Sequence, residues 1–471
     1  MSVRMPLPSW LDLKESTKPD SFAPKAPAFV HLELTRHCNL QCFYCTIRDN
    51  ESPSPSSYSF EHFTKMIDRI AEAEVFEVSF FGGEPFLNPY IYELGKYAVH
   101  AGLVTNFLSN GTLIRRSEVE KIPDIFHSGT IALNGLEIDH DKAVGKHGAF
   151  KQSTRVISEL LEVGFPVALD TLVSASNFTN LEDFLEWISE NLSGVASIFL
   201  NVFAPYEGRN TNEVLSQAQM NNVYEIIDKF NHRAQLRDKI SFGTSFPFCL
   251  VPKQYEYLRK SCSAGWLFGS VGVSGDVRIC SWSAEILGNI FQYSLNEIWQ
   301  NSKSRSYRSL GWVNGDTCAD CDELASCLGG CRVTQRIPSY SVAKNWQKYL
   351  KPVKTERIEV ESRPNSENNQ GPFRVLRLSD GVRVRKERNG GLVYLTKVNQ
   401  VFWLNNSSLV VLDLIDHGLN KVEIVQVLQQ RYGLGEDIQK GLERSLSIFS
   451  KIGIIESSET NLSRPGSNHL N

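Results

Sequence analysis

The stretch Arg36-His-Cys-Asn-Leu-Gln-Cys-Phe-Tyr-Cys45 places three cysteines, Cys38, Cys42 and Cys45, in one short loop. Their spacing, C-x3-C-x2-C, supplies three thiolates and no fourth ligand nearby. Structural zinc sites close with four ligands, commonly as two C-x2-C pairs. A cubane of four irons that is held by three thiolates keeps one iron free for another ligand. The loop therefore predicts an iron–sulfur cluster with a reactive iron; an incomplete zinc knuckle and three unrelated core cysteines are the alternatives.

This loop resembles the signature of the radical S-adenosylmethionine (SAM) superfamily, including the aromatic Tyr44 before the third cysteine. The resemblance implies a [4Fe-4S] cluster that binds SAM at its open iron. Reductive cleavage then yields methionine and a 5′-deoxyadenosyl radical, which removes a hydrogen atom from the substrate. It also implies an electron donor such as a flavodoxin or a ferredoxin.

The composition indicates a globular protein of more than one domain, because 471 residues are too many for one ordinary core. A net charge of −4 argues against a general nucleic-acid binder. No apolar stretch is long enough to span a membrane, and the N-terminus has no signal-peptide pattern. We therefore expect a cytoplasmic protein whose 10 cysteines bind metal and do not form disulfides.

Short apolar runs alternate with amphipathic segments from residue 29 to about residue 240. The strand-like runs are residues 29–34, 75–81, 104–108, 130–133, 167–173 and 197–203. This alternation predicts an α/β fold with a parallel sheet and right-handed crossovers. Active sites of such sheets lie at the carboxyl ends of the strands, and the cysteine loop directly follows the first strand. The superfamily implies a partial (β/α)6 TIM-like radical SAM barrel here.

Polar loops also follow the second and third strands, namely Gly82-Gly-Glu-Pro85 and Ser109-Asn-Gly-Thr112. Glycine allows a backbone to approach a ligand closely, and backbone carbonyls accept bonds from an ammonium group. Arg209, after the sixth strand, is a further candidate. Ordinary turns are the alternative for the two loops, and a surface salt bridge is the alternative for Arg209. Asn134 and Lys146 stand in a segment that departs from the family pattern, and we rank them as weak candidates. By resemblance, the SAM-binding residues are Gly82, Gly83, Glu84, Ser109, Asn110 and Arg209.

The other cysteines lie between residues 249 and 331 in a spacing that resembles the SPASM extension of peptide-modifying radical SAM enzymes. The resemblance implies up to two auxiliary Fe–S clusters. Auxiliary cluster I takes Cys249, Cys262, Cys280 and Cys331, and auxiliary cluster II takes Cys318, Cys321 and Cys327. No cysteine follows Cys331, so cluster II has a non-cysteine ligand, keeps an open iron, or does not assemble. A four-thiolate zinc site at residues 318–331 is the alternative, and Cys249 could instead donate a hydrogen atom to a substrate radical.

Near the C-terminus, three strand-like runs precede three helical patterns. The runs are residues 382–385, 392–395 and 401–404, and they predict a small antiparallel sheet. This winged-helix-like α+β segment, residues 373–457, resembles the PqqD-like domain, or RiPP recognition element. The resemblance implies that it binds the leader of a ribosomal precursor peptide as an added strand. A winged-helix DNA binder is the alternative, supported by the basic residues Arg374, Arg377, Arg383, Arg385, Lys386 and Arg388.

These segments predict the following organisation: an irregular lead-in (1–28), a radical SAM core (29–240), a Cys-rich SPASM extension (241–350), a linker (351–372), the leader-binding domain (373–457) and a disordered tail (458–471). Together they resemble a maturase of ribosomally synthesised and post-translationally modified peptides (RiPPs). We expect oxidative cross-linking or backbone excision of a precursor peptide. Epimerisation, and a non-catalytic Fe–S or peptide-binding scaffold, are the competing hypotheses.

Overall fold

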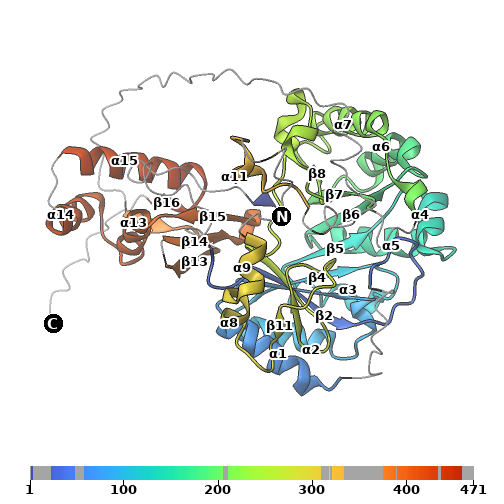
Figure 1. Ribbon diagram of the computed structural model, residues 1–471, viewed down its shortest axis with the longest axis horizontal. Helices are drawn as coiled ribbons and strands as arrows, with labels where there is room; N and C mark the ends of the chain where they lie inside the picture. The colour runs from blue at the N-terminus through green and yellow to red at the C-terminus, as the bar shows by residue number, and fades with distance from the viewer. Residues whose placement is uncertain are drawn as a thin grey trace, which may run out of the picture. The chain divides into compact units, whose positions relative to one another are not determined.

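The computed structural model (Figure 1) describes most of the chain in ten segments. These are residues 2–3, 23–47, 58–204, 210–308, 318, 321–331, 333, 375–388, 390–432 and 436–458. Arg209, Arg374, the linker at 351–372 and residues 459–471 of the predicted tail lie outside them. The chain divides into two compact units, residues 22–350 and residues 1–21 together with 351–471.

One sheet of ten strands organises the larger unit (Figure 1). Its central strands are β2 (Phe29–Thr35), β3 (Glu77–Gly82), β4 (Val104–Ser109), β5 (Ser128–Ala132), β6 (Val167–Val173) and β7 (Ser197–Val202). They lie side by side in chain order and are all parallel, which confirms the predicted radical SAM barrel strands. The strand β8 (Ile240–Phe242) continues the parallel order beyond β7.

Helices connect successive strands and cover the outer face of the sheet (Figure 1). They are α1 (Phe60–Glu72), α2 (Ile91–His100), α3 (Arg116–Val119), α4 (Glu137–Val144), α5 (Ala149–Glu162), α6 (Leu181–Asn191) and α7 (Gln217–Asn231). Serine caps set two of their starts: the Ser59 side chain accepts from the backbone N–H of His62, and Ser216 forms a capping box with Gln219.

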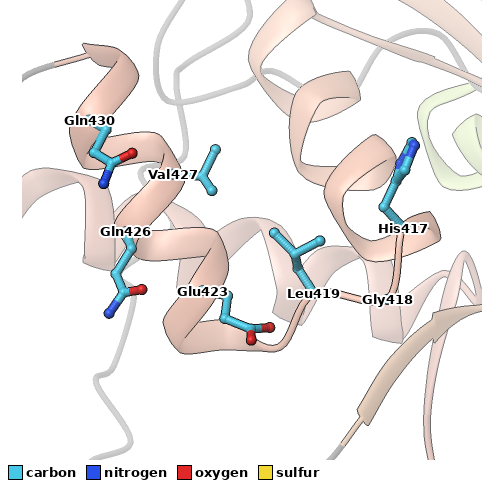
Figure 2. A pocket seen from close by; sticks show the side chains of 7 residues that line it. All are labelled: His417, Gly418, Leu419, Glu423, Gln426, Val427 and Gln430. Atoms are coloured by element: carbon cyan, nitrogen blue, oxygen red, sulfur yellow. The ribbon is translucent and has the colours of Figure 1, made fainter.

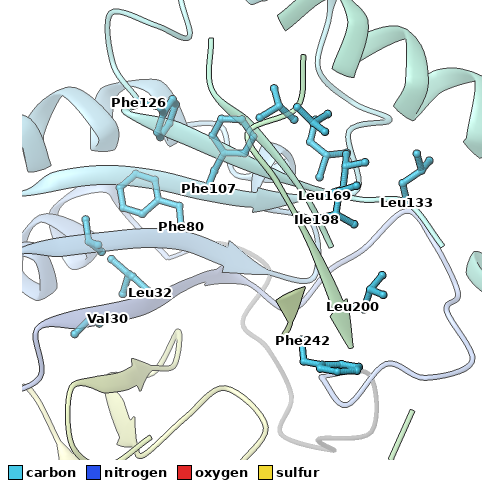
Figure 3. Packing of buried hydrophobic residues seen from close by; sticks show 14 of the residues in the cluster. Val30, Leu32, Phe80, Phe107, Phe126, Leu133, Leu169, Ile198, Leu200 and Phe242 are labelled. Atoms are coloured by element: carbon cyan, nitrogen blue, oxygen red, sulfur yellow. The ribbon is translucent and has the colours of Figure 1, made fainter. Parts of the chain in front are cut away.

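The two faces of the sheet differ in polarity. Phe80 and Phe107 from neighbouring strands pack with Phe126 in the main core, between sheet and helices (Figure 3). Side chains alternate along a strand, so the intervening residues point to the opposite, inner face. In the register across β3 and β4, Ser79 is paired with Asn106 on that inner face. Polar groups therefore lie on the inside of the barrel.

The Cys-rich extension adds strands to the same sheet at the edge formed by β2. Its elements are β9 (Phe268–Val271), β10 (Asp276–Arg278), β11 (Gly288–Asn289), α8 (Leu295–Gln300), α9 (Ser302–Arg308) and α11 (Leu324–Cys327). The strand β9 pairs in parallel with β2, the strand that precedes the first cysteine loop. The buried Glu33 of β2 accepts the backbone N–H of Val273 at 3.4 Å and pairs with Arg36 at 3.2 Å. The extension is thus built onto the strand that carries the candidate cluster loop.

The smaller unit is an α+β domain, as predicted. Its antiparallel sheet contains β13 (Val382–Glu387), β14 (Gly390–Leu395) and β15 (Gln400–Leu404), and its helices are α13 (Asn406–Asp416), α14 (Lys421–Tyr432) and α15 (Glu436–Lys451). Two additions were not predicted. The strand β12 (Val375–Leu378) pairs with β16 (Ile455–Ser458), and β1 (Ser2–Val3) pairs in parallel with the edge of β15.

Several basic residues that supported a DNA binder are engaged by acidic partners within this unit. Arg385 is buried and pairs with Glu387 at 2.7 Å, and Arg377 pairs with Glu456 at 2.6 Å. The charges of these two arginines are therefore compensated by acidic residues of the same unit. Across the described segments, no helix combines the length and the apolar character needed to cross a membrane.

Candidate active site

The first cysteine loop is held against the Gly82-Gly83 turn by backbone hydrogen bonds. The N–H of Gly83 donates to the carbonyl of Thr35 at 2.7 Å, and the N–H of Glu84 donates to the carbonyl of His37 at 2.8 Å. A Cβ atom on Gly83 would lie 2.1 Å from the carbonyl oxygen of His37. Only glycine permits this close approach, so the turn fixes the backbone just before Cys38.

The end of α4 holds the loop from its other side. The N–H of Gln41 donates to the carbonyl of Val144 at 2.9 Å, and the N–H of Phe43 donates to that of Ala143 at 3.1 Å. Leu40 packs in a small buried cluster with Val144. The loop is therefore anchored by the turn after β3 and by the end of α4, which hold the backbone around the three cysteines.

The cysteine thiols affect one another electrostatically. Burial raises the pKa of Cys42, and the neighbouring Cys45 and Cys38 act in the same direction, so that this pKa is about 12. Burial also raises the pKa of Cys38, with Glu84 and Cys45 acting in the same direction. Three thiolates in this loop would repel one another, so a cationic metal centre is needed to hold them deprotonated.

The donor set fits an iron–sulfur cluster. The loop supplies three free cysteine thiols, one exposed and two half-buried, and in a cubane each cysteine binds a different iron. Cys38, Cys42 and Cys45 are therefore the residues that would hold the cluster.

Glu84 joins the two SAM-binding motifs predicted from the sequence. It is fully buried, and its carboxylate accepts from the hydroxyl of Ser109 at 2.8 Å and from the backbone N–H groups of Asn110 at 2.9 Å and Phe86 at 3.1 Å. Burial raises its pKa to about 7, while these hydrogen bonds act in the opposite direction. The carboxylate thus fixes the backbone at the end of β4 relative to the end of β3.

Asn110 extends this network to the cysteine loop. Its side-chain amide donates to Asn39 at 3.0 Å, and the amide of Asn39 donates to the hydroxyl of Thr112 at 2.7 Å. The same Asn110 amide lies 3.9 Å from the sulfur of Cys38. Five of the six predicted SAM-binding residues are therefore brought together beside the first cysteine; Arg209 is the exception, because it is not described.

Asn134, which the sequence ranks as a weak candidate, has a supporting position. It donates to the phenolic oxygen of Tyr44 at 2.7 Å, and its own side-chain oxygen accepts the N–H of Leu172 at 2.9 Å. It is almost completely buried. Asn134 thus orients the ring of Tyr44, the aromatic residue of the cysteine loop, through this hydrogen bond.

Asp170 is a half-buried carboxyl group that the sequence analysis did not identify. It lies on the inner face of β6, where it accepts a hydrogen bond from the side-chain amide of Asn201 on β7. Burial raises its pKa to about 6, against the opposing influence of Asn201 and of the ammonium group of Lys260. One aspartate in a largely apolar strand has no motif around it, so no sequence signal marks it.

The seven later cysteines form two neighbourhoods. The thiol of Cys280 is affected by those of Cys331 and Cys262. The thiol of Cys249 is affected by those of Cys327, Cys318 and Cys321, in that order, and burial together with these neighbours raises its pKa to about 11. The structure thus places Cys249 beside the cysteines predicted for auxiliary cluster II.

One pocket belongs to the smaller unit and contains no cysteine. It has a volume of about 460 Å³, and side chains from the end of α13 and from α14 surround it (Figure 2). The lining residues are His417, Gly418, Leu419, Glu423, Gln426, Val427 and Gln430. None of them belongs to β15, so this pocket is distinct from the strand edge that pairs with β1.

Comparisons with known protein families agree with this geometry. Residues 32–188 match the radical SAM superfamily, and residues 262–322 match the SPASM iron–sulfur cluster-binding domain. The fold and these domains define a radical SAM enzyme of the SPASM type. Its cofactors are SAM, a [4Fe-4S] cluster and auxiliary Fe–S clusters.

Curated relatives of more than one kind are similar to this chain. A PqqA peptide cyclase from Bradyrhizobium diazoefficiens is 27% identical over 319 residues, which cover 65% of this chain and 81% of the relative. An AdoMet-dependent heme synthase from Methanosarcina barkeri is 28% identical over 327 residues, covering 65% and 91%.

Solved structures share the fold. Streptococcus suis SuiB bound to its precursor peptide SuiA superposes with a TM-score of 0.56 at 15% identity, covering 67% of this chain and 74% of SuiB. The enzyme anSMEcpe, with bound AdoMet and the Cp18Cys peptide, has a TM-score of 0.53 at 18% identity, covering 66% and 91%.

Proposed function

We propose that this enzyme modifies a ribosomally synthesised precursor peptide by hydrogen abstraction with the 5′-deoxyadenosyl radical. The reaction is oxidative cross-linking or backbone excision. The leader of the peptide binds to the C-terminal domain, residues 373–457, and the core of the peptide enters the barrel. A flavodoxin or ferredoxin supplies the electron for SAM cleavage, and the reducing cytoplasm keeps the cluster thiols available.

The observation that carries this proposal is the strand pairing at the edge of β15. In the smaller unit, Ser2 and Val3 pair with Gln400 and Val401 as an added strand. An exposed strand edge binds extended peptides through main-chain hydrogen bonds, and neighbouring pockets supply specificity. The pairing of β1 supports the proposal that this edge accepts an added strand, and the leader of a substrate peptide would take the place of β1 there.

A tethered leader changes the energetics of modification. Once the leader is bound, the core peptide reaches the barrel at an effective concentration on the order of millimolar. A weak interaction of the core with the barrel is then sufficient. The similarity to PqqA peptide cyclases supports a peptide substrate, whereas similarity to AdoMet-dependent heme synthases makes a tetrapyrrole the second candidate.

The barrel residues supply orientation and exclude water, and the bound cofactors supply the radical chemistry. Cross-linking removes two hydrogens from the peptide. One leaves as a hydrogen atom to the 5′-deoxyadenosyl radical, and the other leaves as a proton and an electron. An auxiliary Fe–S cluster is the acceptor that we assign to this electron.

The decisive experiment is anaerobic reconstitution of the full chain with iron, sulfide, SAM and a reductant. The substrate to test is a short peptide encoded beside the gene, with an iron coproporphyrin as the competing substrate. Cross-linking shows as a loss of two hydrogens from the peptide mass, and excision shows as the loss of a fragment. Epimerisation in D2O would add one mass unit, and a scaffold would yield no 5′-deoxyadenosine.

A further inference from the structure

The position of Cys249 is set by a close contact between two segments of the Cys-rich extension. The N–H of Phe248 donates to the sulfur of Cys327 at 3.3 Å, and the N–H of Cys331 donates to the carbonyl of Ser245 at 3.1 Å. Residues 245–250 therefore lie directly against residues 327–331. The short turn at Phe248–Leu250 then presents Cys249 on the side of the cysteine run that begins at Cys318.

Gly330 makes this contact possible. It has a φ of +82°, and a Cβ atom there would lie 2.6 Å from the ring Cδ of Pro247 and 2.8 Å from its backbone nitrogen. Such distances exclude any side chain, so the two backbones are packed as closely as they can be. The ion pair between Arg259 and Glu323, at 3.0 Å, is a second link. It joins the segment just before Cys262 to the start of α11.

Electrostatic contacts between the thiols agree with this packing. Cys249 interacts with Cys327, Cys318 and Cys321, whereas Cys280 interacts with Cys331 and Cys262. Cys318 in turn interacts with Cys321 and Cys327. The resemblance to the SPASM family instead groups Cys249 with Cys262, Cys280 and Cys331. The packing and the family pattern therefore disagree.

We propose that Cys249 completes the ligand set of auxiliary cluster II, and that auxiliary cluster I is held by three cysteines and has an open iron. Cluster II then takes four thiolates, from Cys249, Cys318, Cys321 and Cys327. Cluster I takes three, from Cys262, Cys280 and Cys331. Cys249 thereby replaces the downstream cysteine that this chain lacks, and it is not a hydrogen-atom donor.

This inference deepens the proposed function, since it identifies which auxiliary cluster accepts an outside ligand. An iron with no protein ligand can bind a sulfur, nitrogen or oxygen donor from a substrate. The inference depends on the auxiliary clusters and not on the identity of the substrate. It can therefore fail while peptide modification is correct, and the reverse also holds.

The test uses the full chain with Cys38, Cys42 and Cys45 all replaced by alanine, so that only the auxiliary clusters remain. In this background Cys249→Ala, Cys321→Ala and Cys262→Ala are reconstituted anaerobically. Iron content and the electron paramagnetic resonance (EPR) spectrum of the reduced clusters are measured for each. Tyr257→Phe, an exposed side chain that bonds Asp228, serves as the matched control on the same segment.

We expect Cys249→Ala to lose or shift the same EPR signal as Cys321→Ala, and to keep the signal that Cys262→Ala removes. Loss of that second signal in Cys249→Ala would return Cys249 to cluster I and overturn the inference. Unchanged iron and unchanged spectra in Cys249→Ala would also overturn it, because Cys249 would then bind no cluster. A Cys249→Ser variant separates ligand loss from misfolding, since a serine hydroxyl keeps the volume and shifts the spectrum of the cluster that it binds.

The open iron has its own readout. Cyanide is added to the same triple-alanine background, and we expect it to shift the signal that depends on Cys262 and to leave the signal that depends on Cys249 in place. A shift of the Cys249-dependent signal, or no shift in either, contradicts the assignment of three ligands to cluster I.

Discussion

At the scale of single residues, buried carboxyl groups determine how the site is held. Glu84 has no basic partner among its described contacts and accepts only neutral donors, from Ser109, Asn110 and Phe86. A buried acceptor that loses its donors costs about 1–3 kcal/mol. Its role is therefore to fix two loops relative to each other, which in turn positions the backbone groups around the predicted SAM site.

Replacing Glu84 by glutamine tests this role. Glutamine offers one acceptor oxygen in place of two and presents an amide to donors, so one loop loses its anchor. We expect the dissociation constant for SAM to rise by about tenfold to a hundredfold, measured on cluster-loaded protein under anaerobic conditions. The control is Glu61→Gln, since Glu61 is exposed on α1. Unchanged SAM affinity in Glu84→Gln would contradict the assignment.

Asp170 predicts a pH-dependent effect on stability. Its pKa in the folded protein is raised by burial from 3.8 to about 6, despite Asn201 and Lys260, so the folded state prefers the protonated carboxyl. The contribution of this group to stability is present at low pH and is lost as the pH rises through about 6.

Asp170→Asn should therefore stabilise the cluster-free protein by about 2–3 kcal/mol at about pH 8 and by about half of that at about pH 5. Urea unfolding at the two pH values measures the difference. Asp238→Asn is a control, because Asp238 is exposed. A stabilisation that does not depend on pH would show that the carboxyl is not the cause.

At the scale of elements, the turn after β3 and the edge of β15 have the clearest consequences. The turn places a backbone without a side chain against the cysteine loop, and the edge pairs with a segment far away in the sequence. In both cases the structure depends on backbone atoms, so substitutions that alter the backbone contact should act more strongly than changes of side-chain polarity.

Gly83→Ala should prevent the cysteine loop from closing onto the turn, because the new Cβ would lie 2.1 Å from the carbonyl of His37. We expect loss of about four irons per chain, from the radical SAM cluster alone, measured by iron analysis and EPR. Gly194→Ala is the matched control, since a Cβ there has ordinary contacts at 3.5 Å with Leu161. Full iron content in Gly83→Ala would show that the loop tolerates the displacement.

The edge of β15 predicts competition between the N-terminal segment and the leader. Deleting residues 1–3 removes the β1 pairing and frees the edge. Since a typical hydrogen bond contributes about 0.5–1.5 kcal/mol, we expect the leader to bind roughly two- to tenfold more tightly, measured by fluorescence anisotropy of a labelled leader. Ser2→Ala keeps the backbone pairing and should leave the affinity unchanged. Weaker binding after the deletion would mean that β1 belongs to the leader site itself.

At the scale of the whole molecule, the chain contains two units with separate cores. The larger core lies between the ten-stranded sheet and its helices, and the smaller core includes Val393, Phe402 and Leu412. Each unit buries its own apolar residues, so the radical chemistry and the proposed leader binding reside in parts that can be separated.

A chain that ends at residue 350 should therefore retain its iron and cleave SAM without peptide. We expect modification of the peptide at micromolar concentration to fall by about a hundredfold or more, because the tethering of the core is lost. Production of 5′-deoxyadenosine and the mass of the peptide measure the two activities separately. Equal modification by the shortened and full chains would show that the C-terminal unit does not present the substrate.

The sequence alone was sufficient for the parallel sheet, for the small α+β domain and for the class of cofactor, and the resemblance to the radical SAM superfamily implied the barrel. The apolar runs of β2 to β7 alternate with helical patterns, and such local periodicity predicts elements and their parallel order. The spacing of Cys38, Cys42 and Cys45 likewise lies within one loop, where ligand chemistry can be read directly. These features depend on residues that are close together in the chain.

Tertiary structure alone decided the contacts between distant segments. Cys249 is nearer in sequence to Cys262 than to Cys327, but the packing of Gly330 on Pro247 places it in the other group. The contact between Asp170 and Asn201, and the pairing of β1 with β15, likewise join residues that no local pattern connects. Spacing in a sequence limits how far two groups can be apart, whereas the return of the backbone over itself determines which of them meet.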